Sequence, residues 1–369
     1  MTSGPSPLYS VHLSTAKSWR GGENQLFLLA HGLVARGQRV LVVAPRGAPL
    51  LERCAAANVP NLGLRLSGEV DPFATLKLIS LLRRERPQIL HLHDGHAVLH
   101  GQLAGRALPR RVCRVIAHRR TVFPLKGRWK YSGRIDRVIA ISHAVRDELR
   151  KAGISDEKTR VVYSGVDFPE IPSNARAEWR SKLSIGDGEL LAVHAAALSK
   201  EKRQLDLIAS VCAANETLKK LGRSRVHLAL AGSGSEDETL RAEVARRSAS
   251  DVVHFTGFLK DVAELLAAGD VAVYASEAEG LCTALVQAQG AGLPAIVTRA
   301  GGMPEVVEDG TTGIVVPVGD TAAFADGLVK LAGEPGLREK FGRAGAERAK
   351  KMFSAEAMIE GVLGVYKEP

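Results

Sequence analysis

The residues best suited to do chemistry lie in the segment 274–288, where an apolar strand ends and a short turn leads into a helix. The strand ends at Tyr274, the turn contains Glu279 and Gly280, and the helix is expected to begin near Leu281. Backbone amides at the start of a helix, together with the positive end of its dipole, bind anions such as phosphate. A glycine lets a phosphate approach the main chain closely, and a neighbouring glutamate accepts hydrogen bonds from hydroxyl groups. The segment therefore predicts a site for a phosphorylated ligand that carries hydroxyl groups.

A second concentration of polar residues is the string His91-Leu-His93-Asp94-Gly-His96. Three histidines this close in sequence are possible zinc ligands. Residues two apart on a strand point to the same side, so His91 and His93 share one face. His96 instead begins a helix. The string therefore offers two ligands on one face of a strand, with the third histidine set apart on a helix.

The segment around Glu279 belongs to a longer pattern of about 45 residues. It runs from Ser276 to Ala288, continues as Gly-Leu-Pro-Ala-Ile-Val-Thr-Arg-Ala-Gly-Gly-Met-Pro-Glu-Val-Val over 292–307, and closes with the loop 313–320. This pattern resembles the signature of the retaining glycosyltransferases of the GT-B fold, glycosyltransferase family four (group 1 glycosyltransferases). The resemblance implies an α/β chain with two Rossmann-like, doubly wound domains facing a central cleft. It also implies a nucleotide-diphosphate sugar as donor substrate, with no cofactor and no metal.

The resemblance assigns donor-binding roles to residues of the C-terminal half. Glu279 matches the first glutamate of the family's Glu-x7-Glu motif, which contacts the donor sugar. Lys202 matches the family's phosphate-binding lysine. The positions that match the phosphate-binding helix start and the base-binding turn are Gly280, Leu281, Cys282, Gly257 and Phe258.

Two positions depart from the family pattern. Gln287 stands where the family has a second glutamate, which binds the ribose hydroxyls, and Ala197 stands where it has an arginine. Glutamine lacks the charge that strengthens such hydrogen bonds, so we expect nucleotide binding to be weaker by about 1 kcal/mol. Lys200 or Arg203 could supply the charge missing at Ala197. The departures leave open a degenerate, non-catalytic paralogue that serves as a binding subunit.

In the N-terminal half the resemblance points to Gly21, Gly22 and His118. The two glycines fit the family's loop that faces the donor phosphates and the acceptor. His118 follows a strand at the place where a family histidine contacts the donor sugar near the reaction centre. We expect His118 and Glu279 to be the catalytic residues. The family has a similar histidine-rich string without metal, and on the acceptor side we place His93, His96, Arg119 and Arg120.

Strands and helices alternate along the chain in the order that doubly wound parallel sheets require. In the first half the apolar pattern predicts a helix over 24–36 and strands over 8–13, 40–44, 89–92, 112–117 and 138–141. In the second half it predicts helices over 204–221 and 283–291 and strands over 190–195, 226–231, 252–256, 271–274, 294–298 and 313–316. Two prolines near residue 170 interrupt the alternation. We therefore predict an N-terminal acceptor-binding domain (1–168), a linker (169–182), a C-terminal nucleotide-sugar-binding domain (183–353), and a terminal helix (354–369) that packs back on the first domain.

Composition and cysteine usage favour a cytoplasmic protein. The chain is 45% hydrophobic and 24% charged, which is ordinary for a globular protein. Its apolar runs are shorter than the roughly 18–20 residues needed to span a bilayer, and its N-terminus lacks the features of a signal peptide. The four cysteines are far apart and are expected to be reduced thiols.

The positive charge of the chain is concentrated between residues 101 and 140. Asp136 is the only acid there, and the eleven basic residues are Arg106, Arg110, Arg111, Arg114, Arg119, Arg120, Lys126, Arg128, Lys130, Arg134 and Arg137. Such a stretch favours an anionic partner unless it is simply a solvated face. With the resemblance, it suggests a lipid-linked or lipopolysaccharide-core glycan as acceptor and peripheral binding to the inner face of the plasma membrane.

Two further functions are disfavoured. The basic stretch lacks a nucleic-acid recognition module and regularly interleaved aromatic residues, so we expect no nucleic-acid partner. A nucleotide-sugar epimerase shares the GT-B architecture, but its signature differs from the block 301–305.

Overall fold

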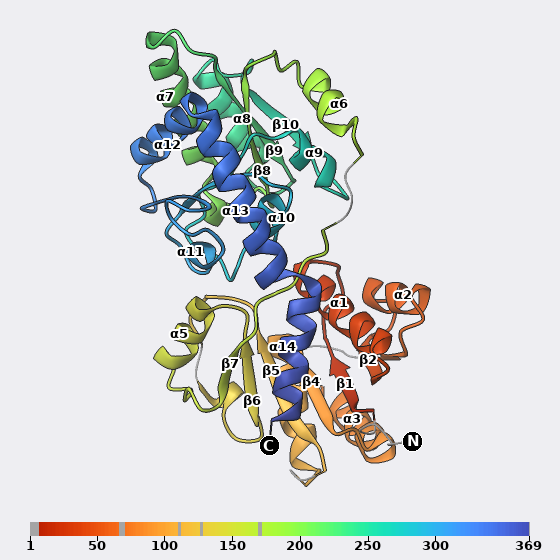
Figure 1. The fold of residues 1–369 in the computed structure, drawn as a ribbon. Coiled ribbons are helices and arrows are strands. Elements are labelled where there is room, and N and C mark those ends of the chain that lie inside the picture. The colour runs from red at the N-terminus through yellow and green to blue at the C-terminus, as the bar shows by residue number, and fades with distance from the viewer. Residues whose placement is uncertain (1–6, 66–70, 110–111, 126–127, 169–171, 369) are drawn as a thin grey trace, which may run out of the picture. The chain divides into compact units, whose positions relative to one another are not determined.

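The computed structural model describes residues 7–65, 71–109, 112–125, 128–168 and 172–368 (Figure 1). The chain forms two compact units, which are described separately. Unit 1 consists of Met1–Gly165 and Ala355–Pro369, and unit 2 consists of Val166–Ser354. Each unit is built on a parallel sheet flanked by helices, so the predicted α/β class with two doubly wound sheets is confirmed.

Unit 1 is organised by a seven-stranded parallel sheet in the order β3-β2-β1-β4-β5-β6-β7. The strands are β1 (Tyr9–Leu13), β2 (Arg39–Pro45), β3 (Asn61–Leu64), β4 (Ile89–Leu92), β5 (Arg114–Arg119), β6 (Arg137–Ala140) and β7 (Thr159–Val161). The strand order changes direction at β1, which pairs with β2 on one side and with β4 on the other. In open parallel sheets, ligands bind beyond the carboxyl ends of the strands at such a switch point.

Helices cover the sheet of unit 1, and the C-terminal helix is one of them. They are α1 (Gly21–Ala35), α2 (Pro49–Ala56), α3 (Pro72–Glu85), α4 (Gly95–Arg106), the 3₁₀ helix η1 (Arg128–Tyr131), α5 (His143–Lys151) and α14 (Ala355–Lys367). The α14 helix packs against α1 so closely that a Cβ atom at Gly32 would lie 2.1 Å from the side chain of Ile359. Arg36 on α1 forms ion pairs with Glu356 and Glu360 on α14, at 3.3 and 3.0 Å.

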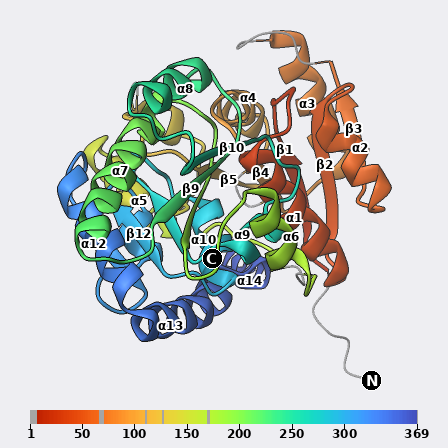
Figure 2. The same ribbon diagram turned by 90° about the horizontal axis from the view of Figure 1, so that it is seen from above.

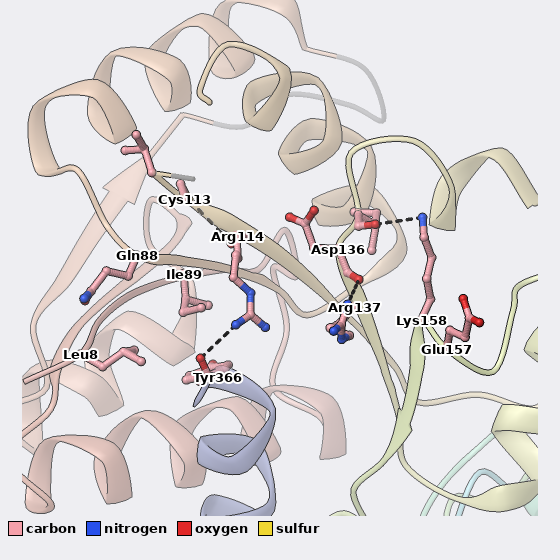
Figure 3. A pocket seen from close by; sticks show the side chains of 12 residues that line it. Leu8, Gln88, Ile89, Cys113, Arg114, Asp136, Arg137, Glu157, Lys158 and Tyr366 are labelled. Atoms are coloured by element: carbon pink, nitrogen blue, oxygen red, sulfur yellow. Dashed lines mark hydrogen bonds between the residues drawn. The ribbon is translucent and has the colours of Figure 1, made fainter. Parts of the chain in front are cut away.

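The end of the chain is bound at the amino edge of this sheet, beside a cavity of about 750 Å³ (Figure 3). Arg114 donates to the backbone carbonyl of Tyr366 at 3.2 Å. The Glu368 carboxylate accepts hydrogen bonds from Arg137 at 2.8 Å and from Arg160 at 2.6 Å. Much of the positive charge here therefore holds the C-terminal segment in place.

Unit 2 is organised by a six-stranded parallel sheet in the order β10-β9-β8-β11-β12-β13. The strands are β8 (Leu190–Ala195), β9 (Val226–Ala231), β10 (Val253–Gly257), β11 (Val271–Tyr274), β12 (Ala295–Thr298) and β13 (Gly313–Val316). The helices are α6 (Ala175–Lys182), the 3₁₀ helix η2 (Lys200–Lys202), α7 (Gln204–Lys220), α8 (Asp237–Arg246), α9 (Ala263–Ala268), α10 (Thr283–Gly290), α11 (Met303–Val306), α12 (Thr321–Gly333) and α13 (Pro335–Phe353). Figure 2 shows α12 beside α7, and the two helices pack on each other.

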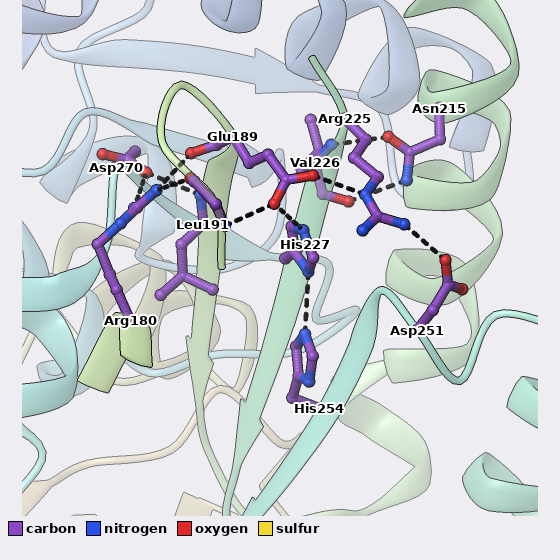
Figure 4. A network of polar contacts seen from close by, with 11 residues as sticks. Arg180, Glu189, Leu191, Asn215, Arg225, Val226, His227, Asp251, His254 and Asp270 are labelled. Carbon is purple, nitrogen blue, oxygen red and sulfur yellow. Dashed lines mark hydrogen bonds and ion pairs between the residues drawn. The ribbon is translucent and has the colours of Figure 1, made fainter. Parts of the chain in front are cut away.

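A polar network joins the starts of three strands in unit 2 (Figure 4). Glu189 binds Arg225 at 2.7 Å and His227 at 3.1 Å, and Arg225 also binds Asp251 at 2.7 Å. His227 in turn lies 3.0 Å from His254 on the neighbouring strand. The network lies at the amino edge of the sheet, opposite to the edge where ligands of parallel sheets bind.

The structure differs from the predicted elements in several places. The α1 helix begins at Gly21 instead of residue 24, so Gly21 and Gly22 lie in its first turn. The β5 strand spans Arg114–Arg119 instead of 112–117, so His118 lies within the strand instead of after it. The stretch 169–182, predicted as a linker, contains α6, which forms because Ala175 and Trp179 are buried one turn apart. Residues 169–171 of that stretch lie outside the described residues. The strands β3 and β7 were not predicted, because each has only three or four residues and most of these are half-buried.

Candidate functional site

Four histidines form a buried cluster in unit 1, at the carboxyl end of its sheet. In the strand register His12 on β1 lies opposite His91 on β4, and His91 lies opposite Ile116 on β5. His93 and His118 follow His91 and Ile116 by two residues. Because strand side chains alternate, His93 and His118 lie on the same face. The ring centroid of His91 is 4.1 Å from that of His93 and 5.3 Å from that of His118. His91 Nδ1 is also 2.6 Å from the hydroxyl oxygen of Tyr366.

Arg120 is bonded to two of these histidines. Its guanidinium group donates to the backbone carbonyl of His93 at 2.7 Å and lies 3.1 Å from His93 Nδ1 and 3.4 Å from His118 Nδ1. Arg119 points elsewhere and donates to the backbone carbonyl of Thr121 at 3.0 Å and to that of Phe123. The two adjacent arginines, both predicted on the acceptor side, thus make different contacts within unit 1.

Burial keeps the cluster uncharged. Desolvation lowers the pKa of His12 to about 3, and the positive charge of Arg120 adds to the effect. Desolvation also holds the pKa values of His91, His93 and His118 well below the ordinary value. These imidazoles are neutral at physiological pH, so each carries one N–H donor and one acceptor nitrogen.

The same geometry bears on metal binding. Ring nitrogens of His12, His91 and His93 lie within 4.8 Å of one another, as in a possible metal site. However, His93 Nε2 is already hydrogen-bonded to His12 Nδ1 at 3.0 Å. An imidazole that bound a metal through Nε2 would carry its proton on Nδ1, where Arg120 offers only donors. A metal would therefore have to displace Arg120 from His93.

The remaining predicted residues of unit 1 lie at two helix starts. Asp94 caps α4 by accepting from the backbone amide of His96 at 3.1 Å, and His96 is exposed outside the four-histidine cluster. Gly21 and Gly22 begin α1, and a Cβ atom at either would meet nothing within 4 Å. A side chain at either position would therefore find open space in the described structure.

In unit 2 the structure brings Lys202 and Glu279 together. The Lys202 ammonium lies 2.5 Å from Glu279 Oε1, and Ser276 donates to the same oxygen at 3.1 Å. Lys202 follows β8 and Glu279 follows β11, which is the neighbouring strand. Burial opposes the charge of Lys202, but the Glu279 carboxylate outweighs this effect and raises the lysine pKa. The pair forms a half-buried, charged site at the carboxyl edge of the sheet.

Two glycines hold the turn that presents Glu279. A Cβ atom at Gly301 would lie 1.9 Å from the Glu279 carbonyl oxygen, and one at Gly302 would lie 2.4 Å from that of Gly280. The Gly302 amide also donates to the Glu279 carbonyl at 3.0 Å. The glycine pair is therefore required by backbone packing beside the site.

The helix after this turn, α10, begins at Thr283, where the apolar pattern predicted it. The phosphate-binding helix start that was expected near Leu281 therefore lies two residues further along the chain. Cys282 has a φ of 68°, in the left-handed region, and forms the N-cap. Leu281 is buried beneath the turn. The backbone at Cys282 thus separates the Glu279 turn from the helix.

The other predicted donor residues lie near the same edge without joining the Lys202–Glu279 pair. Gln287 is half-buried on α10 and lines a small cavity that also contacts Phe168 and Val262. Gly257 ends β10 with a φ of 72°, and the side chain of Phe258 is 76% exposed.

The structure also bears on which residue could supply the positive charge that the family's arginine would provide at position 197. Arg203 forms ion pairs with Asp206 at 2.7 Å and with Glu277 at 3.3 Å. Its charge is already neutralised by acids of its own unit. Lys200, the other residue that could supply the missing charge, is exposed.

Sequence reasoning assigned no role to His12, Tyr366, Asp94 or Ser276, although Asp94 and Ser276 lie within the quoted motifs. A histidine within the apolar first strand is a signal that could have indicated His12. The approach of Tyr366 to His91, separated by 275 residues, leaves no local pattern in the sequence.

Comparison with known families identifies the chain. The family model for "Glycosyl transferases group 1" matches residues 175–348, and the model for "Glycosyltransferase Family 4" matches residues 19–169. The chain belongs to the group 1 glycosyltransferases of family 4 type.

Two curated relatives show how far the similarity of this glycosyltransferase extends. It is 27% identical over 300 residues to the N-acetyl-alpha-D-glucosaminyl L-malate synthase of Bacillus anthracis, covering 79% of this chain and 77% of the relative. It is 30% identical to the D-inositol 3-phosphate glycosyltransferase of Streptomyces bingchenggensis, covering 77% of this chain and 62% of the relative. The chain thus spans less than two thirds of the second relative.

A solved structure confirms the predicted GT-B fold of this glycosyltransferase. The Anabaena protein Alr3699/HepE, crystallised in complex with UDP and glucose, superimposes with a TM-score of 0.82 at 19% identity. The match covers 97% of this chain and 99% of the Anabaena protein. At this identity the similarity establishes the fold and leaves the substrates to be tested.

Proposed function

We propose that this glycosyltransferase transfers a hexose-type sugar from a nucleoside-diphosphate donor to its acceptor with retention at the anomeric carbon and without a metal. The observation that carries the proposal is the Lys202–Glu279 pair on the turn held by Gly301 and Gly302. A lysine can bind the departing diphosphate as a point charge, and a carboxylate can accept hydrogen bonds from sugar hydroxyls. UDP is the first nucleotide to test, because the Anabaena protein was crystallised with it.

In the proposed reaction the bond between the anomeric carbon and the donor phosphate breaks as the acceptor oxygen attacks from the same face. The proton of the acceptor hydroxyl passes to the departing phosphate, which serves as the base. Lys202 and the helix-start amides stabilise the negative charge that develops on the diphosphate, usually a large contribution to catalysis. Glu279 binds sugar hydroxyls and His118 orients the sugar.

The test is a thermal-shift titration of the full chain with UDP, GDP, ADP and CMP, each with magnesium and with chelator. Stabilisation by one nucleoside diphosphate, unchanged by chelator, is the expected result, since a bound ligand stabilises the native state. Turnover of the matching nucleotide sugar then separates an enzyme from the non-catalytic paralogue that Gln287 and Ala197 leave open. Absence of any shift would contradict a donor site.

The role of His118 makes a separate prediction. Replacing His118 with alanine removes a neutral imidazole from the reaction centre, and we expect kcat to fall by about 10²-fold because a misplaced sugar loses its near-attack geometry. The nucleotide-induced thermal shift is expected to persist, since Lys202 and Glu279 are unchanged. The exposed His31 provides the matched control, His31→Ala. Turnover of His118→Ala equal to that of the parent would exclude the role.

We further propose that the acceptor is a cell-envelope glycan or lipid-linked glycan, reached from the cytoplasmic side. Support comes from exposed apolar side chains beside basic ones: Phe123 is 56% exposed and Trp129 is 50% exposed, and Arg128 and Lys130 flank Trp129. Apolar and basic side chains together favour anionic membrane surfaces. None of the described helices is long and apolar enough to cross a membrane.

The structure reduces the basic surface that the sequence suggested. Arg134 is buried and paired with Asp136, while Arg114 and Arg137 hold the C-terminal segment. Arg110, Arg111 and Lys126 lie outside the described residues. The membrane proposal therefore depends on the residues around Trp129 rather than on the whole stretch.

Co-sedimentation with vesicles containing anionic phospholipid tests this part of the proposal. We expect salt-sensitive binding that is weakened by Trp129→Ser and unaffected by Leu221→Ser, which changes an exposed leucine of unit 2. The relatives are named for L-malate and inositol 3-phosphate, which are small anions. If the protein does not bind vesicles but turns over a small anionic acceptor, the proposal of a lipid-linked acceptor is wrong and the acceptor is a small anion.

A further inference from the structure

We propose that Arg120 is a positioning residue that fixes the tautomers of His93 and His118, so that His118 presents an N–H donor to the bound ligand. The inference rests on the proposed role of His118 at the donor sugar. A guanidinium group has five N–H donors and no acceptor. Its terminal nitrogen lies 3.1 Å from His93 Nδ1 and 3.4 Å from His118 Nδ1, so both ring nitrogens must accept. Each of the two neutral rings then carries its proton on Nε2.

The assignment at His93 propagates along a row of hydrogen bonds. His93 Nε2–H donates to His12 Nδ1 at 3.0 Å. His12 must therefore carry its own proton on Nε2, which donates to Ser10 Oγ at 2.9 Å. One direction of donation satisfies every bond from Arg120 to Ser10, and the opposite direction would set two donors against each other at His93 Nδ1. This agreement supports the tautomer at His93 independently of the longer contact to His118.

At His118 the same logic leaves a donor without a partner. The side chain is 3% exposed, and its Nε2 atom has no hydrogen-bond partner among the described residues. A buried donor that makes no hydrogen bond costs free energy, so the unpaired position indicates where a ligand oxygen would be bound. The ligand group must be an acceptor, such as a sugar or phosphate oxygen.

The surroundings of Arg120 keep it able to act in this way. Burial lowers the pKa of Arg120 to about 10, and the carboxylates of Glu23 and Asp94 oppose the loss of charge. Arg120 therefore remains charged near neutral pH. The rings of His12 and His91 face the two imidazoles that Arg120 binds, and Tyr366 contacts His91 behind them. Burial leaves the imidazoles of His12 and His91 neutral.

Ring ¹⁵N spectroscopy of the full chain tests the proposal directly. In the parent protein we expect His93 and His118 to show the neutral tautomer protonated at Nε2, with signals assigned by single histidine substitutions. In Arg120→Met, which keeps a long side chain but has no donor, we expect a second tautomer or a protonated ring at His118. Protonation at Nδ1 of either ring in the parent protein would overturn the proposal, and this outcome does not depend on the Arg120 variant.

Kinetics of the variants supply the functional readout. We expect Arg120→Met to lower kcat tenfold or more while the nucleotide-induced thermal shift is unchanged, and Arg120→Lys to recover part of the loss. Arg106→Met, at an exposed arginine on α4, is the control and should keep the parent kcat. Unchanged tautomers or an unchanged kcat in Arg120→Met would overturn the positioning role. Retained turnover in His118→Ala would instead show that the proposed function of His118 had failed.

Discussion

Replacing Lys202 with alanine is expected to lower turnover by about 10²–10³-fold, because the charge that stabilises the departing diphosphate is lost. In the structure Lys202 is bound to Glu279 at 2.5 Å, and the two side chains are 18% and 11% exposed. Such shielding from water strengthens the interaction of Lys202 with a phosphate oxygen. Binding of the donor would therefore use a charge that is already positioned and largely desolvated.

The control for this prediction is Lys220→Ala, which removes an exposed lysine in the last turn of α7. Its turnover should stay within about twofold of the parent, since an exposed charge is screened by water and salt. Glu279→Gln is the complementary variant: it keeps the side-chain shape but removes the carboxylate that raises the Lys202 pKa. Parent-like turnover in Lys202→Ala, with the fold intact by circular dichroism, would contradict the assignment of the leaving-group site.

The sequence predicted the sheets and the turn of the donor site because both depend on local patterns. Five strands, including those at 190–195 and 271–274, have the bounds that their apolar runs indicated. The turn around Glu279 was recognisable because Gly301 and Gly302 must approach its backbone too closely for any Cβ atom. Steric requirements of this kind restrict residue types and therefore leave a readable pattern.

Other features could not be predicted because they depend on distant contacts. The eleven basic residues look like one patch in the sequence, yet Arg114 and Arg137 bind the C-terminal segment more than 200 residues later. The histidine-rich string likewise gave no indication that Arg120 would orient His93. Charge counts and spacing show which groups are present, whereas strand register determines what they contact.

Lowering the pH from 6.5 to 5 is expected to destabilise unit 1 strongly, because its four clustered histidines are buried and uncharged. An exposed histidine has a pKa of about 6.5, whereas the native pKa of His12 is lowered to about 3 and those of His91, His93 and His118 are also lowered. Below pH 6.5 the unfolded chain therefore binds protons that the native chain does not. The free energy of unfolding falls as the pH falls, by about 1.4 kcal/mol per pH unit for each such group.

The effect can be assigned to the cluster by urea unfolding at several pH values in a Trp179→Phe background. Of the three tryptophans, Trp19 and Trp129 then remain, and both report on unit 1. His12→Gln should reduce the pH dependence by about 1.4 kcal/mol per pH unit, because one proton-binding difference is removed. His31→Gln, at an exposed position on α1, should leave it unchanged. A free energy of unfolding that stayed constant between pH 7.5 and 5 would show that the imidazoles are not held neutral by burial, and the donor directions from Arg120 to Ser10 would lose their basis.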